Sequence, residues 1–171
     1  MRGMAKGFRD DRRGFTMVEL IVTILVIGIV SAVMVVGFSA IGGARENACA
    51  KRLSDLLDQT RLDTMSRVDG GVELELCLRD GSYYGRLLLR TEGEVKRSVE
   101  LGPKSLRLTV MNGEEEIAEI SASQSFRIQF SKGSGAFLFD EEHPAFTSLR
   151  IEGNRAKELV IYGETGRNSL N

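Results

Sequence analysis

Three residues near the N-terminus have types and a spacing that could support processing and charge pairing. Gly14 follows two arginines and precedes the bulky Phe15, and the acidic Glu19 comes four positions later inside an apolar segment. A carboxylate in such a segment is costly unless it lies near an interface or pairs with a positive group. Glu19 therefore either marks the edge of a plain membrane anchor or meets a cation.

The apolar segment after Glu19 has the length of a membrane span. Residues 20–41 contain no charged side chain, and as a helix they would cover about 33 Å, which matches the hydrocarbon core of a bilayer. Residues 1–14 have a net charge of +3, which keeps such a flank in the cytoplasm. We therefore expect a single-pass protein of the cytoplasmic (inner) membrane that contacts the lipid bilayer and places everything after Ile41 outside.

The join between the basic leader and the apolar segment, RRGFTMVELIVTILVIGIVSA, resembles the class III leader of type IV prepilins and type II secretion pseudopilins. The resemblance implies that prepilin peptidase cuts after Gly14 and methylates the new N-terminus, so that Phe15 becomes N-methylphenylalanine. It also implies that Glu19 sets the register of assembly by pairing with the α-amino group of Phe15 on a neighbouring subunit. The implied partners are the peptidase, other pilins or pseudopilins and a membrane assembly platform.

A second, amphipathic helical half follows the apolar segment. Residues 45–65 place Cys49, Leu53, Leu57 and Met65 near helical spacing. Only a glycine pair at 42–43 separates this stretch from the membrane segment, and glycine weakens a helix without forbidding it. We expect one long, interrupted rod of roughly 50 residues.

Beyond residue 69 the hydrophobic period changes from helical to two. Leu74 and Leu76 alternate with Glu73 and Glu75, which predicts a strand with one buried face. A turn signal at residues 80–81 predicts a hairpin to the next strand. Short runs then recur about every ten residues, as in antiparallel sheets. The predicted strands are 72–79, 82–91, 94–101, 106–111, 117–120, 126–130, 136–139, 149–152 and 158–162.

This order of elements predicts an α+β fold. The resemblance to prepilins implies the pilin-like form of it, in which a long N-terminal helix packs on a C-terminal antiparallel β-sheet domain. We place the cytoplasmic prepilin leader at 1–14, the transmembrane and assembly half of the helix at 15–41, and the amphipathic half at 42–68. An extracytoplasmic β-rich domain follows at 69–171.

The C-terminal stretch resembles the ending of GspH/FimT-type pseudopilins and minor pilins through its short apolar runs at 126–130, 133–139, 148–151 and 159–162, followed by Gly166-Arg167. Some proteins of that family bind DNA through a basic Gly-Arg-rich tail. Here no second arginine follows Arg167, and the chain after the leader has a net charge of −4. Because one guanidinium contributes little affinity at physiological salt, a DNA contact at Arg167 is a minor alternative.

Cysteine and histidine offer little further chemistry. Cys49 falls on the apolar helix face, whereas Cys77 points away from the leucine face of its strand. A Cys49–Cys77 disulfide is therefore the less favoured reading, and a buried free Cys49 is its alternative. His143 is the only histidine and lies in an acidic loop, which favours a surface residue over a metal ligand.

No motif in the sequence indicates an enzyme. It has no phosphate-binding loop, no nucleophile with a matching base and no second histidine or cysteine at metal-ligand spacing. We expect no catalytic residue, bound metal or cofactor. The favoured reading is a structural subunit, a minor pilin or pseudopilin of a type IV pilus or type II secretion pseudopilus. The alternative is an unprocessed single-pass protein whose outer β-rich domain binds a partner or DNA.

Overall fold

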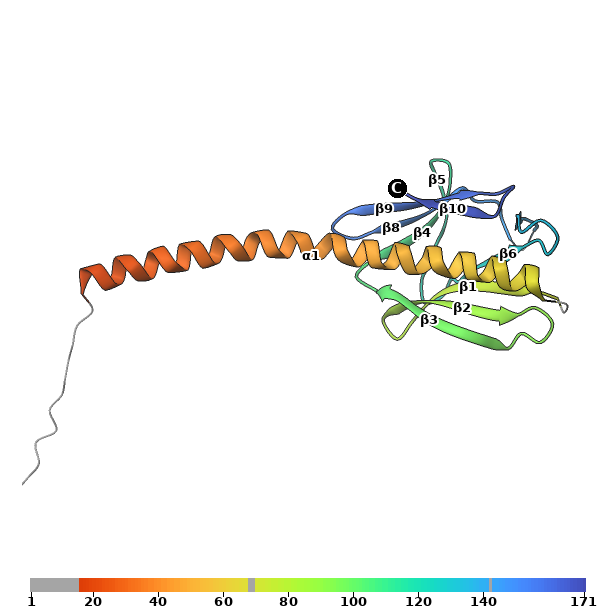
Figure 1. Cartoon of the computed structure of the whole chain (residues 1–171), viewed down its shortest axis with the longest axis horizontal. Helices are drawn as coiled ribbons and strands as arrows, with labels where there is room; N and C mark the ends of the chain where they lie inside the picture. The colour runs from red at the N-terminus through yellow and green to blue at the C-terminus, as the bar shows by residue number, and fades with distance from the viewer. Residues whose placement is uncertain (1–15, 68–69, 142) are drawn as a thin grey trace, which may run out of the picture. The chain divides into compact units, whose positions relative to one another are not determined.

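The computed structural model describes residues 16–67, 70–141 and 143–171, without the side chains of residues 32–42. In this part of the chain, one helix, α1 (Met17–Ser66), precedes ten strands (Figure 1). The chain divides between Phe38 and Ser39 into two compact units, and each is described by itself. The strands are β1 (Val72–Arg79), β2 (Ser82–Leu89), β3 (Val95–Pro103), β4 (Arg107–Asn112), β5 (Glu115–Glu119), β6 (Phe126–Phe130), β7 (Phe137–Leu138), β8 (Ser148–Glu152), β9 (Ala156–Tyr162) and β10 (Arg167–Leu170).

The backbone of α1 is helical over 50 residues without a break, so the predicted interruption at the glycine pair 42–43 is wrong. A glycine costs about 1 kcal/mol relative to alanine inside a helix but keeps its N–H donor, so the helix continues through it. The predicted length of the rod is confirmed. After the helix ends at Ser66, Gly70 and Gly71 adopt positive φ angles of 50° and 86°, where the chain enters β1.

Ten antiparallel strands form two sheets, which confirms the predicted α+β class. Sheet A has the order β3-β2-β1-β6-β7, and sheet B has the order β10-β9-β8-β4-β5. The predicted hairpin joins β1 to β2, with Arg79 opposite Ser82. Asp80 and Gly81 connect them with φ angles of 49° and 80°, as a two-residue hairpin turn with two positive φ angles requires.

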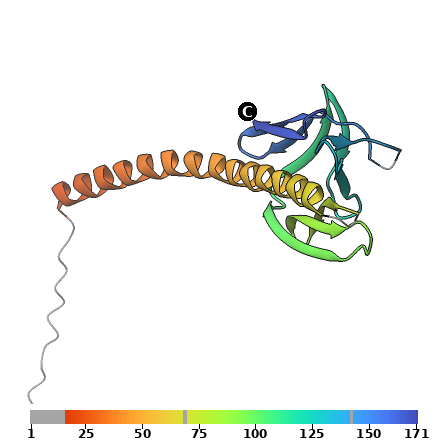
Figure 2. The ribbon, with the colours of Figure 1, turned by 45° about the vertical axis from the view of Figure 1, so that its right-hand side comes forward.

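The core of the second unit lies between the C-terminal half of α1 and the two sheets. Leu53 and Leu57 of α1 are fully buried, as are Leu74 of sheet A and Leu149 of sheet B. Figures 1 and 2 both show β1, β2 and β3 of sheet A on one side of this part of the helix and β8, β9 and β10 of sheet B on the other. One face of helix α1 thus packs against both sheets. This explains why so many positions of that face are buried, namely 46, 49, 50, 53, 56, 57, 60 and 64.

Three details of the prediction are wrong. Met65, which the pattern put on the apolar face, is 40% exposed, and Thr64 takes the buried position. Strand β1 is buried on both faces, because it lies between β2 and β6 and because other side chains cover its outer face. Strand β10 was not predicted as a strand, since its sequence Arg-Asn-Ser-Leu has no clear alternation; its pairing with β9 forms it.

Candidate functional site at the start of α1

The helix α1 starts with a side-chain cap built from Thr16 and Glu19. The Thr16 hydroxyl accepts the Glu19 backbone N–H at 3.2 Å, and the Thr16 carbonyl accepts the Leu20 N–H at 3.1 Å. Thr16 is therefore the N-cap and Glu19 is the third helical residue, the threonine–glutamate spacing of a capping box. The sequence contained this signal, but sequence analysis did not use it.

Glu19 occupies the first turn of α1 and is exposed. The N-terminal end of a helix carries a partial positive charge, so an anionic side chain is favoured there by roughly 0.3–1 kcal/mol. Within the described residues no ion pair engages the Glu19 carboxylate. An ionised carboxylate at this place has acceptor capacity for a cationic donor from outside the described chain.

The other two predicted site residues, Gly14 and Phe15, lie outside the described residues. The described helix begins at Met17, two positions after Phe15.

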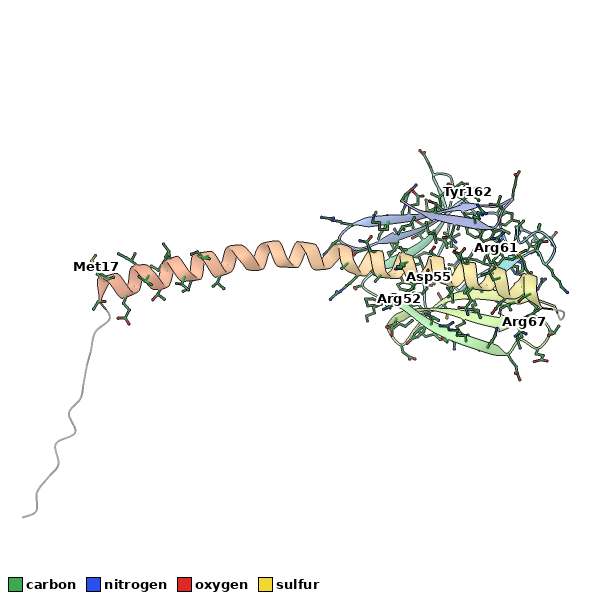
Figure 3. The ribbon with its side chains drawn as sticks, viewed as in Figure 1. Met17, Arg52, Asp55, Arg61, Arg67 and Tyr162 are labelled. Carbon is green, nitrogen blue, oxygen red and sulfur yellow. The ribbon has the colours of Figure 1, made fainter. Side chains whose placement is uncertain are left out.

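Large apolar side chains are exposed along the first turns of α1. Leu20, Ile21 and Ile24 have exposed fractions of 55%, 58% and 61%, and Figure 3 shows this stretch starting at Met17. No helix in the described part of the chain has an apolar stretch long enough to cross a membrane. The predicted span, 20–41, includes residues whose side chains lie outside the described ones.

Further along α1, polar side chains fasten the helix to both sheets. Arg52 donates to the Glu100 carbonyl of β3 at 3.1 Å, and Asn168 of β10 donates to Asp58 at 3.1 Å. Arg61 donates to the Gly135 carbonyl at 3.1 Å. Figure 3 shows Arg52 and Arg61 along this half of the helix. These contacts hold the second half of α1 in one orientation on the β domain.

Glu46 is a buried residue that sequence analysis missed. Its side chain is 1% exposed, and its Oε1 accepts the backbone N–H groups of Asn154 at 2.6 Å and Arg155 at 3.3 Å. Oε2 has no hydrogen-bond partner. The signal was available, because position 46 is in phase with the buried positions 49, 50 and 53 of the helix. Glu46 fastens α1 to the turn between β8 and β9.

Both cysteines are free and buried. No disulfide joins the two in the structure, and Cys49 is fully buried. Burial raises the pKa of the Cys49 thiol to about 11. The free thiol therefore stays neutral at physiological pH and is a poor nucleophile.

His143 is not a surface residue, which corrects the expectation from its acidic loop. The residue is 5% exposed, its Nε2 lies 3.2 Å from Oε1 of Glu73, and its Nδ1 lies 2.7 Å from Oδ1 of Asp140. The acidic loop around His143 gave no sign of this burial, because the contacting residue Glu73 is 70 positions away in sequence. Among the described residues no group of three or more acidic, histidine or cysteine side chains is arranged to hold a metal ion.

Arg167 is the exposed first residue of β10 and lies opposite Tyr162 of β9. Its backbone N–H donates to the Thr165 hydroxyl at 3.4 Å, which shapes the turn between the two strands. The residue is thus accessible, with an aromatic side chain as its cross-strand neighbour.

Comparison with known proteins identifies the N-terminal segment. Residues 9–35 match the family model described as the prokaryotic N-terminal methylation motif. No curated protein and no solved structure matches the chain. The matched range contains Gly14, Phe15 and Glu19 as well as the capped start of α1, so the chain carries the N-terminal motif of type IV pilin-like prepilins.

Proposed function

We propose that this chain is the precursor of a minor pilin or pseudopilin, a structural subunit that prepilin peptidase processes and that then enters a type IV pilus or type II secretion pseudopilus. The observation that carries the proposal is the match of residues 9–35 to the methylation motif. The long helix followed by an antiparallel β domain supports it, since the resemblance to pilins implies this order of elements.

The position of the helix cap is compatible with cleavage after Gly14. A cut there leaves Phe15 as the only residue ahead of the N-cap Thr16. The first helical hydrogen bonds, from Glu19 and Leu20 to Thr16, therefore survive the cut. Processing removes the basic leader and creates a positive amine within a few residues of Glu19 without unravelling α1.

Glu19 then acts as the assembly residue. The new α-amino group of Phe15 on a neighbouring subunit is a cation that the Glu19 carboxylate can bind. In an apolar surrounding an unpaired carboxylate is strongly disfavoured, so subunits are held where each carboxylate meets an amine. Pairing of this kind selects one register between neighbouring helices.

Residues 15–41 anchor the precursor in the cytoplasmic membrane, with the leader in the cytoplasm and the β domain outside. The exposed apolar side chains between Met17 and Val30 support this proposal, because so large an apolar surface calls for lipid or for other subunits. In the filament, neighbouring helices replace the lipid. The assembly platform that drives this transfer is a proposed partner.

The β domain acts as a structural module, and we propose no catalysis for it. Its strands bury most of their apolar side chains on α1 and on each other. The exposed Arg167 supplies one cation of the several that a DNA surface needs. We therefore do not propose DNA as a partner.

Mass spectrometry of the N-terminus, on chain purified from its native membrane, tests the proposal. The expected result is a chain that begins at Phe15 and carries one additional methyl group. A Gly14→Val variant should keep its leader, whereas Gly7→Val, which also changes a leader glycine, should still be cut. Wild-type chain with an intact leader would refute the proposal and favour the unprocessed single-pass alternative.

A further inference from the structure

A polar pocket of about 390 Å³ lies beside the start of the β-domain half of α1. Its walls come from three segments that are far apart in the chain: α1, the chain around the β3–β4 turn and the chain around the β8–β9 turn. These segments meet at Glu46, Leu106 and Asn154. Nothing in the proposed pilin function uses this pocket.

Glu46 forms part of the pocket wall and has an unused hydrogen-bond acceptor. The residue is 1% exposed, and its Oε1 accepts the backbone N–H groups of Asn154 and Arg155. Its Oε2 accepts no hydrogen bond from the part of the chain that the structure describes. A buried acceptor without a donor is costly, and more so when it belongs to a carboxylate. Oε2 therefore needs a donor that the described chain does not supply.

Gly153 keeps the wall beside Glu46 free of a side chain. A Cβ at this position would overlap Oε1 of Glu46 and would lie 2.9 Å from a side-chain carbon of Leu106. Gly153 is not among the glycines with a positive φ angle, so its backbone conformation is open to other residues. The space beside the carboxylate, and not the turn, therefore requires a glycine here.

The pocket is lined by charges of both signs, Arg45 and Arg107 against Glu46 and Glu152. Arg107 is already engaged by Glu119 at 2.9 Å and by Glu152 at 3.8 Å. Arg45 is exposed, and no ion pair engages it among the described residues. A lone cation would face two arginines, and a lone anion would face two glutamates. A ligand that carries a cationic N–H donor next to an anion matches this pocket best.

The place of the pocket along α1 indicates where such a ligand comes from. Arg45 and Glu46 follow Ile41, the end of the proposed span, by four and five residues, which is about 6–7.5 Å of helix. The headgroup layer on each side of a bilayer core is about 5–7 Å thick. This step rests on the membrane anchor of the proposed function. We propose that the pocket binds the phosphoethanolamine headgroup of a membrane lipid, with its ammonium on Oε2 of Glu46 and its phosphate on Arg45.

The chemistry of the two ends of the headgroup fits these residues. A primary ammonium has three N–H donors, and one of them supplies the bond that Oε2 lacks. A guanidinium binds phosphate through charge-assisted hydrogen bonds. Because Oε2 is closed to water, the ammonium reaches it by displacing the exposed turn at Ser105. A fully methylated ammonium has the same charge but no N–H donor, so methylation separates the hydrogen bond from the charge.

Native mass spectrometry of the full-length chain, purified from its membrane in mild detergent and freed of lipid, tests the proposal. Three lipids with the same acyl chains are added in turn. Phosphatidylethanolamine should bind at least about tenfold more tightly than phosphatidylcholine, which has no N–H donor, and than phosphatidylglycerol, which has no ammonium. Equal binding of the three lipids overturns the proposal.

A soluble probe distinguishes a membrane lipid from a free metabolite with the same headgroup. Glycerophosphoethanolamine has the phosphate and the ammonium but no acyl chains. It should bind more weakly than phosphatidylethanolamine, because it gains nothing from apolar contacts with α1 and the detergent. Binding as tight as that of the lipid would overturn the assignment to a membrane lipid.

Substitutions separate a headgroup site from a purely structural role of Glu46. Glu46→Gln keeps the size and one acceptor oxygen but removes the charge, so the preference for phosphatidylethanolamine over phosphatidylcholine should fall below about twofold. Arg45→Gln should weaken the binding of all three lipids and leave the preference in place. Asp55→Asn, which removes an exposed charge further along α1, should change neither reading. An unchanged preference in Glu46→Gln contradicts the proposal, and the comparison of lipids in the wild type decides the question even where a variant fails to fold.

The same spectra test the proposed function separately, because the mass of the chain shows whether the leader has been removed. A chain that keeps its leader and still prefers phosphatidylethanolamine refutes the pilin role and supports the headgroup site. A processed chain without this preference refutes the headgroup site alone.

Discussion

Gly166 lies where two loops of the β domain touch beneath α1, and its replacement by alanine tests that contact. Its φ angle is +65°, and a Cβ on it would overlap the carbonyl oxygen of Gly135. The same carbonyl accepts a hydrogen bond from Nε of Arg61 at 3.1 Å. The Gly135 carbonyl cannot yield easily, because it is a main-chain atom and moves only with the backbone of its loop.

The expected loss in Gly166→Ala has two parts. A non-glycine residue at this φ costs about 1–2 kcal/mol. Separating the two loops costs about 1–3 kcal/mol more, as overpacking usually does, and it lengthens the Arg61 hydrogen bond. Gly113 is the matched control, since its φ is +64° and nothing lies within 4 Å of its Cβ position. Gly113→Ala should therefore lose only the first part, about 1–2 kcal/mol.

The assay is a urea titration of the full-length chain in mild detergent, with proteolysis of the unfolded β domain as the readout. Gly166→Ala should lower the free energy of unfolding by at least about 1 kcal/mol more than Gly113→Ala does. Equal losses in the two variants would show that backbone strain alone explains the effect. In that case the contact between the two loops contributes nothing measurable to the free energy of unfolding, and the reasoning from the overlap is wrong.

Four further predictions follow from the named contacts. Glu46→Ala removes the acceptor of the β8–β9 turn, so the same urea titration should show a loss of about 1–3 kcal/mol. Because burial raises the pKa of Cys49 from 9.0 to about 11, the folded chain favours the neutral thiol. The free energy of unfolding that this preference contributes is present below pH 9 and is lost as the pH rises through 11. Cys49→Ala should abolish this decline of the free energy of unfolding with pH. The hydrogen bond from Arg107 lowers the pKa of Glu119, so Arg107→Ala should raise that pKa in a carboxyl NMR titration. The unfolding midpoint should barely move, since both side chains are exposed. Glu19→Ala should be cleaved as the wild type is, yet enter filaments at least about tenfold less often in pull-downs of sheared filaments; equal incorporation contradicts its pairing role.

The strands that were predicted best are those with strong local signals. The β1–β2 hairpin follows from alternating leucines and an Asp-Gly turn, both of which act within a few residues. Strand β6 was predicted with the bounds that the structure has. Strand β10, by contrast, depends on hydrogen bonds to β9, so a pattern within its own four residues could not reveal it.

Buried charges were the weakest part of the prediction. Glu73 and Glu75 alternate with leucines, which indicates a solvent-facing side, yet both are buried. The side chains that cover the two glutamates are Arg86, Arg127 and His143, which belong to two other strands and to a loop. The sheet order that brings these groups together has no local signature.

The sequence by itself determined the N-terminal motif and the succession of the helix and of strands β1 to β9. These features depend on side chains that are neighbours along the chain: the cap residue Thr16, the apolar period of α1 and the turn glycines. Only the tertiary structure decided that Glu46 meets Asn154, 108 positions away, and that His143 meets Glu73. Such contacts require a particular sheet order and a particular helix orientation, and these follow from packing summed over the whole domain.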